Sequence, residues 1–120
     1  VTFKHNNTYY IMYSPNYFGG ANYAVGYATS KSPLGPFVKS ASNPVLSKNA
    51  DSGGIVTGTG HNSITYSPDG KEMFCVYHGR TTKTGDQRVV FIDRMKILPD
   101  GKLVVDGPTT DPQPLPSGAR

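Results

Sequence analysis

Short runs of alternating apolar and polar residues, separated by turn sequences, make up most of the chain. Three segments repeat a strand, a turn and a second strand: VTFK-HNNT-YYIMYS at 1–14, NSITY-SPDG-KEMFCVYHG at 62–79 and DRMKI-LPDG-KLVV at 93–105. Asn-Asn and Pro-Asp-Gly favour tight turns, because Asn and Gly accept a positive φ and Pro fixes the angle of entry. The pattern therefore predicts three antiparallel hairpins.

The segments between the hairpins predict two further strands, a loop and a tail. NYAVGYATS at 22–30 alternates as a strand does, and its Gly26 indicates a bulge or a close backbone approach. NPVLS at 43–47 is expected to form a short edge strand led by proline. KNADSGGIVTGTG at 48–60 is expected to be a Gly-rich loop, long enough to have a function. From residue 107 the chain becomes rich in proline, which predicts a tail over 107–120, either extended along a surface or disordered, after strands that occupy 1–106.

Composition supports an all-β fold. The chain has 120 residues, with 14 Gly, 10 Pro, 8 Tyr and 5 Phe, and no stretch shows a helical apolar stripe of useful length. Tyr, Phe, Val, Ile and Thr suit half-buried strands, while Gly and Pro mark turns. Repeated antiparallel hairpins fit either a sandwich or the blades of a β-propeller, and repetition alone does not decide between them.

Charge and apolar content argue against nucleic-acid and membrane partners. The net charge is +4, but the 12 basic residues are spread along the chain, whereas nucleic-acid binders concentrate theirs on one face. No run of about 18 apolar residues is present, so we expect no membrane-spanning helix. Cys75 is the single cysteine and lies within MFCVY, where we expect a buried apolar residue without a disulfide.

The second hairpin carries the candidate chemistry. His61 precedes its first strand, and His78 and Arg80 end its second, so pairing of the strands would bring all three close together. His78 and Arg80 are two residues apart and therefore share one face of a strand. A serine hydrolase built on Ser63 is disfavoured, because Gly-His-Asn-Ser is not a nucleophile elbow and no strand-to-helix turn is predicted.

Five stretches, in this order, resemble glycoside hydrolase family 43. The stretches are KHNNTYYIMYS (4–14), YAVGYATSKSPLGPF (23–37), GHNSITYSPDGKEMFCVYHGR (60–80), FIDRM (91–95) and DGPT (106–109). The resemblance extends from Val1 to about Thr109 and implies antiparallel sheets that form blades of a partial five-bladed β-propeller. It also implies activity on arabinose, xylose and sometimes galactose units of plant polysaccharides.

The same resemblance implies that the chain corresponds to the C-terminal part of such an enzyme. Family members use an Asp general base on the first blade, an Asp that tunes the acid on the second, and a Glu general acid on the third. That Glu typically stands in a Glu-Gly-Pro or Glu-Ala-Pro element just before the strand that VTFK would begin. No residue here matches any of the three, so no catalytic residue is expected within this chain.

The acidic residues, considered by themselves, lead to the same expectation. Inverting hydrolysis needs two carboxyl groups about 6.5–9.5 Å apart, one of them kept protonated by its surroundings. Asp69 and Asp100 belong to turns, and Glu72 follows a turn and is expected to be solvated. Asp93 is expected to be either an ion-pair partner of Arg94 or a hydrogen-bonded strand residue. The remaining acids are Asp51, Asp86, Asp106 and Asp111.

By the resemblance, His61 is expected in the substrate pocket, where it would bind a calcium ion or another cation directly or through water. The alternative is a histidine that holds its loop by hydrogen bonds, since calcium prefers oxygen ligands. Arg80 is expected to reach the bound sugar, or else to be a surface residue, and His78 is expected to line the same cleft. Tyr17 and Phe18, in the loop PNYFGGAN, are further candidates for stacking on a sugar.

Two functions remain open at this stage. The chain is either the C-terminal part of an inverting glycosidase that requires its front half, or a non-catalytic carbohydrate-binding or self-assembling module derived from a truncated propeller. Uncovered blade faces and strand edges favour association. We therefore expect a homo-oligomer or a complex with a missing N-terminal half. Secretion or a periplasmic location is expected for the parent enzyme.

Overall fold

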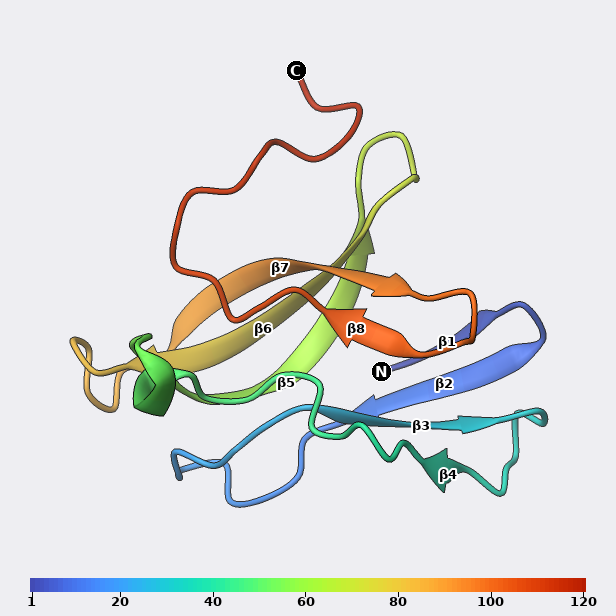
Figure 1. Ribbon diagram of the computed structural model, residues 1–120, viewed down its shortest axis with the longest axis horizontal. Helices are drawn as coiled ribbons and strands as arrows, with labels where there is room; N and C mark the ends of the chain where they lie inside the picture. Colours follow the sequence, from blue (N-terminus) through green and yellow to red (C-terminus); the bar gives the residue numbers. More distant parts are fainter.

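Two four-stranded antiparallel sheets and one short 3-10 helix, η1 (Ala50–Ser52), account for the regular structure of the protein (Figure 1). The computed structural model describes residues 1–120. In each sheet the strands follow one another in chain order, β1-β2-β3-β4 in the first and β5-β6-β7-β8 in the second. Each sheet is thus a simple meander, as expected of sheets built from consecutive hairpins. No helix in the structure has the length and apolar character needed to cross a bilayer.

The first sheet contains β1 (Thr2–His5), β2 (Thr8–Tyr13), β3 (Gly26–Ser30) and β4 (Val38–Lys39). His5 pairs with Thr8, which leaves Asn6 and Asn7 as the two turn residues, at φ of 47° and 64°. Positive φ at both central positions is the geometry of the two-residue hairpin turn that suits the twist of the strands. The first predicted hairpin is confirmed.

The second sheet contains β5 (Val56–Tyr66), β6 (Met73–Thr81), β7 (Val89–Ile97) and β8 (Leu103–Val105). The turn between β5 and β6 is closed by the Asp69 carboxylate, which accepts the backbone N–H of Lys71 at 3.0 Å. Asp100 does the same for Lys102 between β7 and β8, also at 3.0 Å. Both remaining predicted hairpins are confirmed, and both of these acids have a structural role in a turn.

Two of the predicted segment boundaries are wrong. The Gly-rich segment at 48–60 is a loop only as far as residue 55, because β5 begins at Val56 and pairs there with Thr81. NPVLS at 43–47 forms no strand, and only Leu46 makes an isolated bridge, to Val25. The Asn43 side chain takes the place of strand-to-strand hydrogen bonds here. Its Oδ1 atom accepts the N–H of Tyr27 at 2.9 Å, and its Nδ2 atom donates to the Tyr27 carbonyl at 2.8 Å.

The hydrophobic core lies between the two sheets and draws on both. Tyr10, Met12, Val25, Tyr27 and Leu46 come from the first half of the chain, and Cys75, Tyr77, Met95, Leu103 and Val105 from the second. The hydroxyl of Tyr10 donates to the carbonyl oxygen of Gly101 at 2.7 Å, and the N–H of Leu103 donates to the Tyr27 hydroxyl at 3.2 Å. Burial of each large apolar side chain stabilises the fold by about 1.5–3 kcal/mol.

Cys75 lies fully inside this core, as the sequence predicts. Burial raises the pKa of its thiol to about 12, although a hydrogen bond from Asn62 opposes the shift. A thiol with so high a pKa is almost entirely protonated at neutral pH, and the thiolate is the nucleophilic form. Cys75 therefore contributes packing and not chemistry.

The tail, residues 107–120, contains no strand and curves back from β8 toward the turn between β5 and β6 (Figure 1). At the start of the tail, the Thr109 hydroxyl and N–H both donate to the carboxylate of Asp93. Near its end, Ser117 bonds to Asp69 and Glu72 beside the turn. The tail is thus docked against the second sheet at both ends.

Candidate functional site

His61 and His78 lie on adjacent strands where the second sheet faces the loop between β2 and β3. His61 belongs to β5 and His78 to β6, and the residue before His61, Gly60, pairs directly with His78. The centroids of the two imidazole rings are 6.1 Å apart. The structure therefore brings together the two histidines that the hairpin pattern places near each other.

The backbone around His61 is irregular. The register of β5 against β6 shifts between Thr57 and Gly60 and again between Gly60 and Ser63. His61 itself has a φ of 53°, a left-handed conformation that is unfavourable for a residue with a side chain. Its N–H donates to the hydroxyl of Ser14 at 2.7 Å, which anchors this conformation to the end of β2. Bulges and strained residues of this kind are frequent beside active sites.

The two glycines before His61 allow close approach of other groups. A Cβ at Gly60 would come within 2.1 Å of the Tyr23 ring, and a Cβ at Gly58 within 2.7 Å of the Arg80 guanidinium. Gly58 also has a φ of 58°. The TGTG sequence is therefore required so that Tyr23 and Arg80 can pack against β5.

His78 is half-buried and has unused hydrogen-bonding capacity. Its ring stacks on that of Tyr23 with centroids 5.9 Å apart, and its Nδ1 atom is buried without a hydrogen-bond partner. Burial is the main cause that lowers the pKa of His78, and electrostatic interactions with Arg88, His61 and Arg80 lower it further. The imidazole is consequently neutral at neutral pH, with one nitrogen as a donor and the other as an acceptor.

Arg80 is committed to the loop between β2 and β3. Its Nη1 and Nη2 atoms donate to the carbonyl oxygens of Gly19 and Gly20, each at 2.8 Å, and its side chain is 11% exposed. Asp86, fully exposed, lies 3.6 Å from Nη1. The arginine therefore joins the two sheets, and the prediction that it contacts a sugar stays a prediction.

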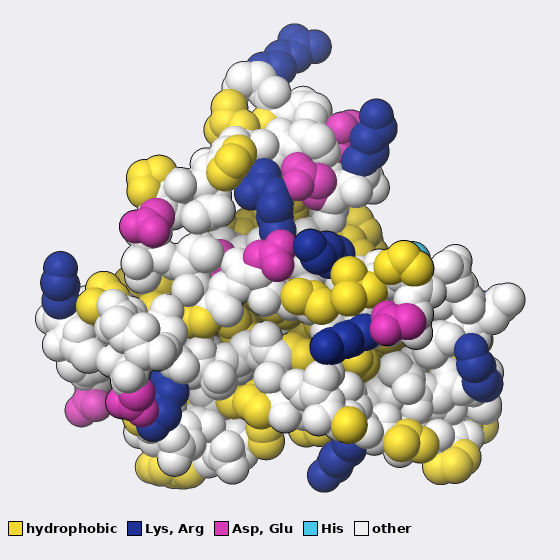
Figure 2. Space-filling view, viewed as in Figure 1, with side chains coloured by type: hydrophobic (Ala, Val, Ile, Leu, Met, Phe, Trp, Pro, Cys, Tyr) yellow, Lys and Arg dark blue, Asp and Glu magenta, His cyan; other side chains and the backbone are white.

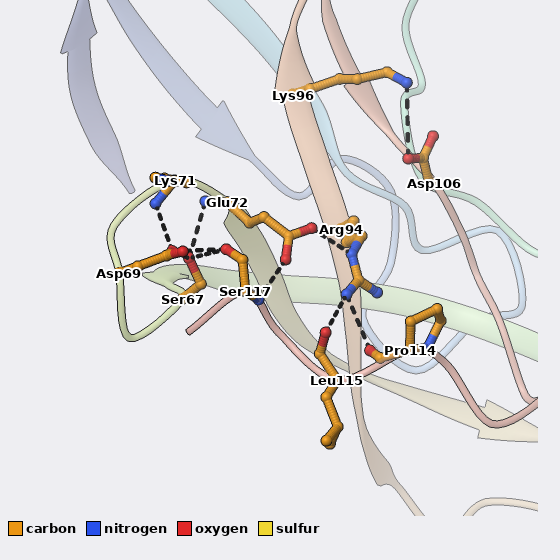
Figure 3. A network of polar contacts seen from close by, with 10 residues as sticks. All are labelled: Ser67, Asp69, Lys71, Glu72, Arg94, Lys96, Asp106, Pro114, Leu115 and Ser117. Atoms are coloured by element: carbon orange, nitrogen blue, oxygen red, sulfur yellow. Dashed lines mark hydrogen bonds and ion pairs between the residues drawn. The ribbon is translucent and has the colours of Figure 1, made fainter. Parts of the chain in front are cut away.

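Two acidic side chains, Asp69 and Glu72, share a partner in the tail, Ser117 (Figure 3). Ser117 donates from its hydroxyl to Asp69 at 2.6 Å and from its N–H to Glu72 at 2.7 Å. Arg94 donates to Glu72 at 2.6 Å. The expectation that Glu72 is simply solvated is wrong, because two partners distant in sequence hold its carboxylate.

These contacts lower the pKa of both carboxyl groups. For Asp69 the hydroxyl of Ser117 contributes most, followed by that of Ser67 and the N–H of Lys71. For Glu72 the hydrogen bond from Arg94 contributes most, followed by the N–H of Ser117. Both groups are ionised at neutral pH, so neither can serve there as the proton donor of an acid–base pair.

Asp93 is the one buried acid, with 2% of its surface exposed. Its carboxylate accepts the Tyr77 hydroxyl at 2.6 Å as well as the hydroxyl and N–H of Thr109. Burial is also the main cause that raises the pKa of Tyr77. Of the two expectations for Asp93, the hydrogen-bonded strand residue is confirmed, and Arg94 pairs with Glu72 instead.

The residues around His61 do not make a calcium site by themselves. Nowhere in the chain do three or more His, Cys, Asp or Glu side chains gather as metal ligands. Calcium takes about six to eight oxygen ligands, whereas His61 lies beside the imidazole of His78 and its N–H donates to the Ser14 hydroxyl. A calcium ion at His61 stays a prediction and would need donors from outside the chain.

A groove of about 550 Å³ lies apart from the histidines, between β7 and the tail. Phe91 and Leu115 are among its apolar lining residues, and Thr109, Asp93 and Arg94 among its polar ones. Since Asp93 and Arg94 are fully engaged in docking the tail, we regard this groove as a consequence of tail docking. The histidine pair has the unpaired atom and the irregular backbone, and is the better candidate site.

Ser14 and Tyr23 belong to this site but were not expected there from the sequence. Both come from the ends of the β2–β3 connection, which is far from the histidines along the chain. The alternating pattern of Tyr23, Val25 and Tyr27 does indicate a buried position for Tyr23. It gives no sign that the ring would lie against His78.

Comparison with known proteins decides the family. A sequence model of glycosyl hydrolases family 43 matches residues 1–103. The chain belongs to glycosyl hydrolases family 43. The resemblance noted in the sequence is confirmed, and the two sheets are blades of the five-bladed β-propeller of this family.

Three relatives illustrate how much of a family 43 protein this chain represents. It is 40% identical over 103 residues to β-D-galactofuranosidase xynD of Aspergillus niger, covering 84% of this chain and 29% of the relative. A thermostable family-43 glycoside hydrolase is 48% identical with a TM-score of 0.88, over 98% of this chain and 38% of that one. An endo-1,4-β-xylanase from Bacteroides thetaiotaomicron is 33% identical with a TM-score of 0.79, over 90% and 36%. The chain thus spans about a third of the length of these relatives.

Proposed function

We propose that this chain supplies the C-terminal blades of an inverting family 43 glycosidase that acts on arabinose- or xylose-containing plant polysaccharides. In this proposal His61 and His78 form one wall of the sugar-binding cavity, and Arg80 lies behind it. The general acid and the general base come from blades outside the chain. The observation that carries the proposal is that the histidine pair has no carboxylate partner among the eight acids of the chain.

The environment of each notable acid supports this division. Asp69 and Glu72 share Ser117 and are therefore close together, but hydrogen bonds lower the pKa of both. An inverting pair instead needs one carboxyl group whose pKa is raised, so that it holds a proton at the working pH. Asp93 is buried, but three donors from Tyr77 and Thr109 occupy its carboxylate.

The polar groups of the histidine wall suit a sugar better than an ionic substrate. The Nδ1 atom of neutral His78 is buried, so its ring offers a sugar hydroxyl the other nitrogen, Nε2, as donor or acceptor. Elsewhere on the molecule, the face shown in Figure 2 has Lys and Arg side chains interspersed with acidic ones and carries no extended single-sign patch. The names of two relatives, a galactofuranosidase and an endo-1,4-β-xylanase, also fit a polysaccharide built from furanose or xylose units.

A partial propeller also needs partners for its exposed blade faces. Several large apolar side chains are solvent-exposed, including Leu34 at 95% and Val90 at 78%. Exposed apolar surface favours association. We propose that the chain works in contact with the front blades of a family 43 propeller, or pairs with another copy of itself when those blades are absent.

A chimera tests the proposal. The matching 38% of the thermostable family-43 glycoside hydrolase would be replaced by this chain, and hydrolysis of nitrophenyl arabinofuranoside, xyloside and galactofuranoside would be measured. We expect turnover by the chimera, none by the isolated chain, and a loss of at least tenfold in kcat/KM for His78→Ala. Lys102→Ala, an exposed substitution far from the histidines, is the matched control and should leave the rate unchanged.

A folded chimera without activity would contradict the proposal. So would turnover by the isolated chain at the rate of an ordinary enzyme, since that would require an acid and a base among its own residues. Cooperative thermal unfolding of the chimera, monitored by circular dichroism, establishes whether it is folded.

A further inference from the structure

Two neighbouring aromatic side chains project from the loop between β2 and β3. Tyr17 is 68% exposed and Phe18 is 57% exposed, and their ring centroids lie 5.0 Å apart at an interplanar angle of 55°. Isolated exposed apolar residues are common on proteins, but a fixed aromatic pair beside a candidate binding site calls for an explanation. The hydrogen bonds of the loop show that the pair is held in place.

The loop is held from inside and from the neighbouring sheet. Within it, the N–H of Gly20 donates to the Tyr17 carbonyl at 2.9 Å, and the side chain of Asn16 donates to the Asn22 carbonyl at 2.9 Å. The Tyr17 ring lies directly over Gly19, where a Cβ would come within 2.6 Å of it. The loop is therefore a defined turn with one aromatic ring resting on its backbone.

Two residues of the second sheet fix the loop from outside. Arg80 donates to the Gly19 and Gly20 carbonyls, and the N–H of Gly58 donates to the Ala21 carbonyl at 3.0 Å. These bonds join segments that are far apart in the chain. A binding surface fixed in this way loses little conformational entropy when a ligand arrives, which favours affinity.

The aromatic pair is continuous with the histidine wall. The guanidinium of Arg88 lies over the Phe18 ring, 5.6 Å from its centroid. Arg80, which bonds to the loop carbonyls of Gly19 and Gly20, lies two residues after His78 on β6. His78 in turn lies beside His61. The loop of Tyr17 and Phe18 therefore adjoins the strands of the histidines, and a ligand that extends from the histidines onto this loop would meet the aromatic pair.

We propose that Tyr17 and Phe18 form a stacking platform for a sugar unit of the polysaccharide, next to the unit held by the His61–His78 wall. This inference rests on the proposed function, because it concerns the same substrate class. A furanose or pyranose ring has an apolar C–H face and a polar edge. The face can bury against an aromatic ring while Arg88 and the Tyr17 hydroxyl bond to the edge.

The choice of a sugar over a protein partner comes from the composition of the surface. Beside the pair lie the Arg88 guanidinium and the hydroxyl of Tyr17 itself, so the apolar rings have hydrogen-bonding groups close by. Ligand sites for small polar molecules combine such rings with a few fixed polar groups. Burial of the pair by the absent blades is the competing explanation, and the experiment separates the two.

The test measures binding of the full 120-residue chain to soluble arabinoxylan and arabinan by affinity electrophoresis, with dextran as the control polysaccharide. We expect the double substitution Tyr17→Ala with Phe18→Ala to weaken binding at least tenfold. Tyr17→Phe keeps the ring and should change the affinity less than threefold. Tyr66→Ala is the matched control, because Tyr66 is also an exposed tyrosine, at 55%, but lies at the far end of β5.

Unchanged binding by the double variant would overturn the inference, as would the absence of any binding by the unaltered chain. Nitration of Tyr17 provides a second measurement, with protection expected from arabinoxylan. If Tyr17 were protected from nitration in the chimera without any polysaccharide, and not protected by arabinoxylan in the isolated chain, the aromatic pair would belong to a contact between blades. That result would also overturn the inference. The chimera's hydrolysis is a separate readout, so an active chimera whose KM is insensitive to the double variant refutes the platform alone.

Discussion

Arg80 and Arg94 stand on neighbouring strands of the second sheet, and both donate to backbone carbonyl oxygens of a segment distant in sequence. Arg94 bonds to the carbonyls of Pro114 and Leu115 in the tail at 3.0 and 3.2 Å, and to Glu72. Arg80 bonds to Gly19 and Gly20 in the β2–β3 loop. Each arginine therefore fixes an irregular segment against the sheet.

The surroundings of the two arginines differ in what they leave unused. Around Arg94 the carboxylates of Asp69 and Glu72 are held by hydroxyl, N–H and guanidinium donors (Figure 3). Around Arg80 the Nδ1 atom of His78 has no partner, and His61 keeps an unfavourable φ. A saturated network indicates a structural role, and a strained site with spare capacity indicates a role in binding.

The largest effect is expected at Asp93, the buried acid that binds the start of the tail. Asp93→Ala leaves the Tyr77 hydroxyl and two groups of Thr109 without their acceptor. Loss of buried partners of this kind should lower the free energy of unfolding by about 3 kcal/mol. Urea denaturation measures the change, and Asp111→Ala, in the exposed part of the tail, should stay within about 0.5 kcal/mol. An Asp93→Ala variant with an unchanged free energy of unfolding would contradict the structural role of Asp93.

Arg80 should show the next largest effect. Arg80→Ala removes two hydrogen bonds from a charged donor, which should lower the free energy of unfolding by about 2 kcal/mol. Arg80→Lys keeps the charge but not the planar fork, and should fall between the variant and the unaltered chain. Lys83→Ala is the exposed control. NMR shifts of Tyr17 and Phe18 should change in both Arg80 variants, and constant shifts would show that Arg80 does not position the loop.

Acid should weaken the tail contacts. The pKa of Glu72 and that of Asp69 are lower in the folded state than in the unfolded chain, so their charged forms stabilise the fold above pH of about 4. This contribution is lost as the pH falls through the folded-state pKa. We expect the urea midpoint to drop between pH 6 and pH 3, and to drop less in Glu72→Gln. The control Asp111→Asn should lose as much of its urea midpoint as the unaltered chain does. If Glu72→Gln also lost that much, Glu72 would not contribute to the acid sensitivity of the tail contacts.

His78 should titrate below an ordinary histidine. Its folded-state pKa is lowered chiefly by burial, so the folded protein binds its proton less readily than the unfolded chain does. Stability from this group is complete above pH of about 6.5 and decreases as the pH falls toward the folded-state pKa. An NMR titration of the ring protons measures this directly. A midpoint at or above 6.5, on the order of the reference value, would show that the ring is not desolvated.

Local chemistry explains why much of the fold was predictable from the sequence. Asn6 and Asn7 accept the positive φ of a hairpin turn, and Asp69 and Asp100 cap their own turns, so neighbouring residues define these features. The start of β5 at Val56 was missed because Gly58 and Gly60 resemble a loop. These two positions need glycine because the Tyr23 ring packs against Gly60 and the Arg80 guanidinium against Gly58, and both side chains come from other segments of the chain.

The candidate site was predictable only in part for the same reason. His61 and His78 are joined by one hairpin, so the pattern brings them together. The contacts of Arg80 with Gly19 and of Glu72 with Ser117 span 61 and 45 residues, and no local signal encodes them. The expectation of a solvated Glu72 failed because the position of the tail could not be derived from its composition.

We propose that the chain contributes a sugar-binding wall and neither the acid nor the base of the reaction. The most direct test is the release of nitrophenol from aryl arabinofuranoside and xyloside by the purified 120-residue chain. We expect no release above the buffer rate from the chain alone, and turnover once the chain occupies its place in the chimera. Release at an enzymatic rate by the chain alone, abolished by Asp69→Asn or Glu72→Gln, would contradict it.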